Sequence, residues 1–127
     1  MTECVCGSGK LFHQCCMPFL DYMKFAPTPE KLMRSRFSAY ALGGYGDYLL
    51  RSWLPTMTEG LDAAVLSQRD TQWQSLCILN ARQQGDDGYV EFKADYLDED
   101  NAIINYQEKS VFKRIKGKWL YVGVELK

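Results

Sequence analysis

The chain has 127 residues, of which 46% are hydrophobic and 13% aromatic, enough for the core of one ordinary domain with a small appendage. Its formal net charge of −1 excludes a general electrostatic preference for nucleic acid or membranes. The sequence contains no apolar run of about 18 residues and no basic segment followed by an apolar one at its start, so we expect neither a membrane span nor a signal peptide, and a cytoplasmic location.

Four cysteines lie within the first sixteen residues, Cys4, Cys6, Cys15 and Cys16. In a reducing cytosol such a cluster is more typical of a metal site than of disulfides. Four thiolates can close a tetrahedral shell around one Zn²⁺, and a closed shell is typical of structural zinc rather than catalytic zinc. His13 is an alternative ligand in place of one cysteine, although Cys16 already fits the spacing.

The loop between the two cysteine pairs is a candidate partner surface. Gly7-Ser8-Gly9 favours a tight turn, because glycine adopts positive φ without steric cost. The next four residues, Lys10, Leu11, Phe12 and His13, would then be displayed beside the metal to a protein partner. The alternative is that the metal only anchors the N-terminal segment, and the sequence leaves both interpretations open.

The chain divides into a knuckle with its connector, residues 1–26, and a main domain, residues 27–127. The connector, residues 18–26, is rich in aromatic side chains, so we expect it to pack the knuckle against the main domain. The main domain opens with a helix in which Thr28 is the N-cap and Pro29 occupies the first turn. Gly43-Gly44 ends this helix.

Two shorter helices are predicted next. One covers residues 47–54 and ends before Pro55, and the other begins after Thr58 as its N-cap.

From about residue 71 the pattern becomes that of strands. They are separated by a turn at residues 85–88, an acidic loop at residues 98–101 and a Lys-Gly-Lys turn at residues 116–118. We expect strands at residues 73–83, 89–97, 102–115 and 119–126. Helices followed by an antiparallel meander indicate an α+β fold. Cys77 lies in an apolar run of the first strand, where we expect a buried small hydrophobic side chain.

The run Cys4-Val5-Cys6-Gly7-Ser8-Gly9-Lys10, followed by Cys15-Cys16, resembles the SEC-C motif, a zinc knuckle named for its place at the C-terminus of the SecA translocation ATPase. In many SEC-C motifs the fourth ligand is histidine, and here Cys16 takes that place. The resemblance implies contacts with proteins, since the SecA-type motif contacts a chaperone and the ribosome.

Later segments are similar to the YchJ family of bacterial proteins. They are residues 29–37, 40–41, 47–49, 88–92, 108–112 and 117–122, together with Trp53 and Pro55. The resemblance implies a nuclear-transport-factor-2-like (NTF2-like), cystatin-like cone, in which helices are cradled by a curved antiparallel sheet. It implies no particular activity, because this cone hosts enzymes, binding modules and structural subunits.

Two charged residues are candidates for the interior of the cone. Arg36 falls on the apolar side of the first helix, where a charge is costly unless paired. Glu108 alternates with apolar residues on one face of the third strand, so we hypothesise that the two meet inside. The pair is either a structural ion pair or the polar floor of a ligand pocket. Arg34 points elsewhere on the helix and is expected to be solvated.

Three functions follow from these features. The main hypothesis is a zinc-binding cytosolic adaptor that contacts another protein through the knuckle. The alternative is a small-molecule-binding or enzymatic cone with a purely structural knuckle. A weaker alternative is RNA or ribosome binding through the basic residues 113–118. No catalytic residues are predicted, because His13 is the only histidine and no carboxylate is singled out. A dimer through the open face of the sheet is compatible with the fold.

Overall fold

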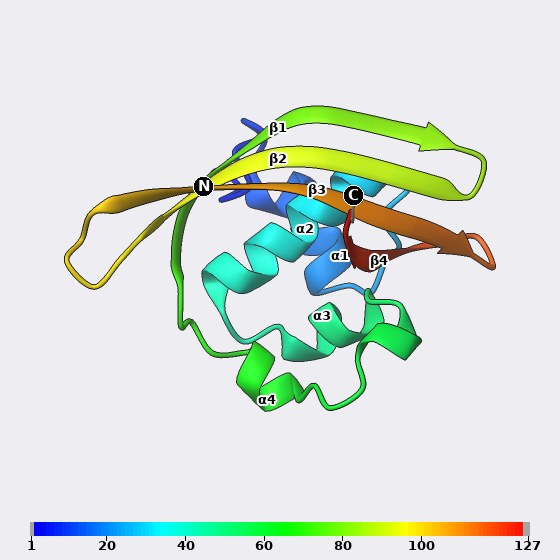
Figure 1. The fold of residues 1–127 in the computed structure, drawn as a ribbon, viewed down its shortest axis with the longest axis horizontal. Helices are drawn as coiled ribbons and strands as arrows, with labels where there is room; N and C mark the ends of the chain where they lie inside the picture. Colours follow the sequence, from blue (N-terminus) through cyan, green and yellow to red (C-terminus); the bar gives the residue numbers. More distant parts are fainter. Residues whose placement is uncertain (1, 126–127) are drawn as a thin grey trace.

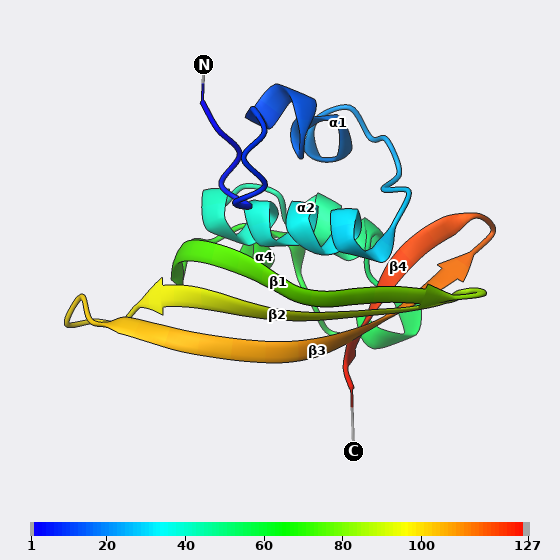
Figure 2. The same cartoon turned by 90° about the horizontal axis from the view of Figure 1, so that it is seen from above.

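One long helix lies between a curved sheet and the N-terminal segment in the computed structural model, which describes residues 2–125 (Figures 1 and 2). The four strands form an antiparallel meander in the order β1-β2-β3-β4, which confirms the predicted α+β class. Their bounds are β1 Gln72–Gln84, β2 Asp87–Leu97, β3 Ile103–Ile115 and β4 Lys118–Val124. The expected end of the last strand, Leu126, lies outside the described residues.

The helical elements precede the sheet. They are η1 Phe12–Gln14, α1 Met17–Leu20, α2 Pro29–Leu42, α3 Gly46–Arg51, η2 Pro55–Met57 and α4 Ala63–Leu66. Within the described chain no helix has the length and apolar character needed to cross a membrane.

Helix α2 begins and ends where the sequence predicts. The Thr28 hydroxyl accepts a hydrogen bond from the backbone N–H of Lys31 at 3.2 Å, and Gly43 ends the helix with a φ of +76°. One face of the helix buries Met33 and Phe37 against the concave face of the sheet. The sequence around α2 therefore fixes the central element of the fold.

The two short helices differ from the prediction. Helix α3 ends at Arg51, three residues early, because the backbone of residues 52–54 pairs instead with Tyr121 of β4. The Leu54 N–H donates to the Tyr121 carbonyl, and the Tyr121 N–H donates to the Ser52 carbonyl, each at 2.8 Å. Thr58 does not cap α4, since the Asp62 carboxylate does so by accepting the Ala64 N–H at 2.7 Å. The expectation for Thr58 was therefore wrong.

Cys77 is exposed, which corrects the expectation that it is buried. A register shift between Trp73 and Ser75 changes which residues of β1 face the core. Cys77 consequently lies on the outer face of the sheet, opposite Lys93. This outer face is polar where β2 pairs with its neighbours, with hydrogen bonds from Ser75 and Asn105 to the Asp95 carboxylate.

The connector packs against the body through only some of its apolar residues. Leu20 and Ala26 are buried, whereas Tyr22, Met23 and Phe25 are 67%, 66% and 60% exposed. The apolar composition of the connector therefore reflects burial only in part.

Candidate metal centre and ligand pocket

The four N-terminal cysteines form one cluster. Their Sγ atoms all lie within 4.8 Å of one another, with Cys6 to Cys15 at 3.6 Å and Cys15 to Cys16 at 3.9 Å. A tetrahedral zinc site with Zn–S bonds of about 2.3 Å has sulfur–sulfur edges of about 3.8 Å. The arrangement therefore fits a four-cysteine metal site. His13 is exposed in η1 and is not among the clustered ligands.

The local backbone brings the two cysteine pairs together. The Cys4 N–H donates to the Lys10 carbonyl at 2.8 Å, so the segment folds back on itself. Gly7 makes the turn with a φ of +78°, and a Cβ at this position would lie 3.0 Å from the Leu76 carbonyl oxygen of β1. Gly7 thus permits both the turn and a close approach of the knuckle to the sheet.

Helix α2 holds the cluster from its outer face. The Ser38 hydroxyl donates to Cys16 Sγ at 3.3 Å and lies 3.7 Å from Cys4 Sγ. Arg34 donates from Nη1 to the Cys6 carbonyl at 2.9 Å and from Nε to Glu30 at 3.1 Å.

Arg34 is largely buried, although the sequence analysis expected it to be solvated. Its side chain is only 19% exposed. Burial acts to lower the pKa of Arg34, but its hydrogen bonds to Glu30 and Cys6 outweigh that and raise it above the ordinary value. The guanidinium therefore stays charged beside a cluster of thiolates, where it offsets their negative charge.

The thiols of Cys6, Cys15 and Cys16 differ in acidity. Hydrogen bonds from Cys16, Cys4 and Ser8 lower the pKa of Cys6, while its burial opposes them. Hydrogen bonds to Cys4 and Cys6, and then burial, raise the pKa of Cys16, and burial raises that of Cys15. A metal ion that binds the cluster would displace the thiol protons.

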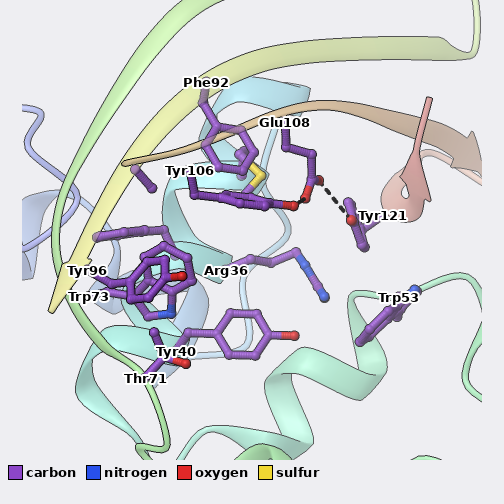
Figure 3. Close-up of a pocket in the computed structure, with 13 residues that line it drawn as sticks. Arg36, Tyr40, Trp53, Thr71, Trp73, Phe92, Tyr96, Tyr106, Glu108 and Tyr121 are labelled. Atoms are coloured by element: carbon purple, nitrogen blue, oxygen red, sulfur yellow. Dashed lines mark hydrogen bonds between the residues drawn. The ribbon is translucent and has the colours of Figure 1, made fainter. Parts of the chain in front are cut away.

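A second candidate site is a cavity of about 430 Å³ between α2 and the concave face of the sheet (Figure 3). Its walls are mostly aromatic. The lining residues are Met33, Arg36, Phe37, Tyr40, Trp53, Thr71, Trp73, Phe92, Ala94, Tyr96, Tyr106, Glu108 and Tyr121. Such a cavity, apolar with a few polar groups, is typical of small-molecule sites.

Arg36 lies at the floor of this cavity with 2% exposure. Its Nη1 donates to the Leu49 carbonyl at 2.8 Å and to the Ser52 hydroxyl at 2.7 Å. The guanidinium carbon lies 4.7 Å from the Trp53 ring centre and 4.6 Å from that of Tyr121, so the cation packs against two aromatic rings that are themselves in edge-to-face contact. Burial lowers the pKa of Arg36, but an arginine remains protonated in proteins.

Glu108 is bound by hydroxyl groups. It accepts from Tyr106 at 2.5 Å, from Tyr121 at 2.9 Å and from Ser110. Burial, together with the charge of Glu108, raises the pKa of both tyrosines. Arg36 and Glu108 line one cavity, but none of the ion pairs within residues 2–125 joins them.

Trp53 lines the cavity with its ring. Its indole Nε1 finds no hydrogen-bond partner within the described part of the chain, but this atom is fully buried and is not open to the cavity. Nothing in the sequence separates Trp53 and Trp73, which line the cavity, from Trp119, which is buried in the core, because aromatic residues at such spacings are usually core residues. Thr71 carries no sequence signal either, because it lies in an irregular segment.

The predicted partner surface is divided in the structure. Lys10 and His13 are exposed, whereas Leu11 and Phe12 are half-buried. At the other candidate surface, the basic hairpin, Lys113 and Arg114 form ion pairs with Asp87 and Asp86 at 2.5 and 2.9 Å, which offsets part of its charge.

Comparison with known proteins covers nearly the whole chain. Residues 28–124 match the model of the YchJ middle NTF2-like domain, and residues 3–18 match that of the SEC-C motif. UPF0225 proteins of Sodalis glossinidius and Photorhabdus laumondii are 40% and 42% identical, over 95% and 96% of this chain and 81% and 80% of theirs. The solution structure of a SEC-C motif containing protein from Rhodopseudomonas palustris is similar with a TM-score of 0.89, 33% identity and 99% coverage of both chains.

Proposed function

The chain belongs to the YchJ-like UPF0225 family, in which a SEC-C motif precedes an NTF2-like domain, and we propose that its cone binds a small organic molecule in the cavity beneath α2. In this proposal the four cysteines hold a structural Zn²⁺ that fixes the knuckle to the cone.

The buried charge of Arg36 carries the proposal. Burying a cation is costly unless an anion or several acceptors compensate it. A purely structural ion pair would place Glu108 on this guanidinium, whereas Glu108 is bound by three hydroxyl donors instead. The cavity thus keeps a cation whose counter-charge is free to come from a ligand.

The same arrangement favours binding over acid–base catalysis. Three donors engage the Glu108 carboxylate, so it is poorly placed to take a proton from a substrate. His13 lies in the exposed turn η1, in the knuckle rather than in the cavity wall.

Zinc is supported by the ligand chemistry. Four soft thiolates at tetrahedral spacing suit Zn²⁺, and with Cys16 as the fourth ligand the shell has no open position for a substrate. The hydrogen bonds from Arg34 and Ser38 are of the kind that orient metal ligands.

Binding of the neutral fluorophore N-phenylnaphthylamine tests the cavity. Thr71→Trp should block the cavity, because Thr71 lies half-buried in its wall, whereas Thr56→Trp adds the same side chain at an exposed position. We expect fluorescence enhancement with the wild type and with Thr56→Trp and its loss with Thr71→Trp. Equal binding by the two variants would place the probe elsewhere and contradict the proposal.

A protein adaptor is the second candidate, favoured by the exposed connector residues Tyr22, Met23 and Phe25. Lys24 lies among them, and the Lys118 ammonium sits 4.5 Å from the centre of the Phe25 ring. This combination suits a protein segment with apolar and acidic side chains. A partner captured by the wild type and by Thr71→Trp, but lost with Tyr22→Ser/Phe25→Ser, would support the adaptor. Retention by the connector variant would exclude this surface.

A further inference from the structure

We propose that the ligand of the cone is a monocarboxylate with a planar apolar body, bound with its carboxylate against Arg36. This inference rests on the proposed function and names the chemical class that the cavity selects. It follows from the hydrogen bonds that the polar groups of the cavity already make within the protein.

The unused groups at the floor of the cavity are donors. Among the described residues, Arg36 makes both of its hydrogen bonds through Nη1, which leaves Nε and Nη2 without an acceptor. Trp53 Nε1 also has no acceptor in this part of the chain, but it is fully buried, out of reach of a ligand. Figure 3 shows the guanidinium between Glu108, Tyr121 and Trp53, with the Tyr40 hydroxyl turned towards the same end.

The carboxylate of Glu108, by contrast, is nearly saturated. Two oxygens accept about four hydrogen bonds, and three hydroxyl groups already donate to Glu108. A ligand that brings donors would therefore find few acceptors, and one that brings acceptors would complete the floor. Leaving these donors unpaired costs about 1–3 kcal/mol for each buried group, which a matching ligand recovers.

A carboxylate fits better than a more highly charged anion. Its planar pair of oxygens matches the fork of a guanidinium, and its single negative charge is repelled less by Glu108 than a double charge would be. A dianionic phosphate would place excess negative charge near Glu108, which lines the same cavity. The site therefore favours a single negative charge.

The walls define the rest of the ligand. The Trp73 ring packs edge-on against Phe37, Tyr96 and Tyr106, with ring centres 6.1, 5.2 and 6.1 Å away. These rings line the same cavity as Arg36, which is buried, whereas Tyr106 is partly exposed to solvent. A flat apolar or aromatic body suits such walls, so the ligand enters with its carboxylate first.

Pairs of acids and their amides test the inference. Naphthoate, indoleacetate and cinnamate keep their shape in the corresponding amides but lose the charge. Displacement of N-phenylnaphthylamine from the wild type should show at least one acid binding roughly 10- to 100-fold more tightly than its amide, as expected for charged hydrogen bonds. Arg36→Met should abolish this preference while the neutral probe still binds.

A second variant guards against misfolding of Arg36→Met. Arg36→Lys keeps the positive charge but removes the planar fork of donors, so the preference for the acid should fall several-fold. Amides that bind as well as the acids, or a preference that survives Arg36→Met, would overturn the inference. If the neutral probe still binds in that case, the proposed function stands without it. If the neutral probe binds nowhere in the cavity, the proposed function and the inference fail together.

Discussion

Replacing Arg34 with methionine should loosen the knuckle from the cone. Methionine keeps an unbranched apolar chain but removes the guanidinium that donates to the Cys6 carbonyl at 2.9 Å and to Glu30 at 3.1 Å. Loss of the charged hydrogen bond to a largely buried carbonyl costs about 1.5–3 kcal/mol. The ion pair with Glu30, one helical turn away and partly exposed, adds only about 0.3–0.5 kcal/mol.

We therefore expect Arg34→Met to lower the free energy of unfolding by about 2–3 kcal/mol, or the melting temperature by roughly 10 °C. Because Arg34 also lies 3.9 Å from Cys6 Sγ, metal affinity should fall about 10-fold or more. Urea unfolding of the metal-loaded protein measures the first effect, and competition with a chromophoric chelator measures the second.

Glu30→Gln is the matched control, because it removes the ion pair and leaves the contact of Arg34 with Cys6 in place. It should cost less than about 0.5 kcal/mol. Equal destabilisation of the two variants would refute the conclusion that Arg34 holds the knuckle to α2. So would an Arg34→Met variant with the wild-type free energy of unfolding and metal affinity.

Three further predictions concern the knuckle and the cavity. Removing the metal with a strong chelator should expose residues 2–26 to limited proteolysis before the cone is cut, and equal protection with and without metal would argue against a metal-held knuckle. Gly7→Ala should cost at least about 1 kcal/mol more in urea unfolding than Gly9→Ala, because both positions have positive φ but only Gly7 has a neighbour, the Leu76 carbonyl, at 3.0 Å from a Cβ. The pKa of Tyr121 is raised in the fold by burial and by Glu108. Its stabilising contribution is therefore complete below the ordinary tyrosine pKa of about 10 and is lost as pH rises through the folded value. Stability measured by urea unfolding should fall above roughly pH 10, and less steeply in Tyr121→Phe. A profile that this substitution leaves unchanged would contradict the reasoning.

Elements with local chemical signals were predictable from the sequence. Thr28, Pro29 and Gly43 mark the ends of α2 through capping and φ preferences that need no tertiary context. The Lys116-Gly117 turn is equally local, with positive φ at both residues. The spacing of the four cysteines predicts a metal cluster because it fixes which ligands can converge. In each case the information lies within a few neighbouring residues.

Features that depend on distant segments were not predictable. Arg34 looks solvated on a helical wheel, because nothing within the helix shows that the knuckle covers this face. Cys77 looks buried because a β-bulge in β1 is invisible in the alternation pattern. Helix α3 ends early because Tyr121, far along the chain, offers backbone partners to residues 52–54. The hydrogen-bond partners of Glu108 were not predictable for the same reason. The curvature of the sheet decides which hydroxyl groups reach its carboxylate, so the sequence could not show that they bind it in place of Arg36.

Helix α2 links the two candidate sites. Neighbouring positions on a helix are rotated by about 100°, so Arg34 and Arg36 face different sides. Arg34 and Ser38 contact the cysteine cluster, while Arg36 and Phe37 form part of the cavity. A single helix lying on a sheet normally leaves its outer face in water, yet here Ser38 is fully buried beneath the thiols. The knuckle thus supplies the second layer that α2 requires. If the cluster holds a metal and the cavity a ligand, as we propose, metal removal should also weaken binding in the cavity, although none of the cysteines lines its wall.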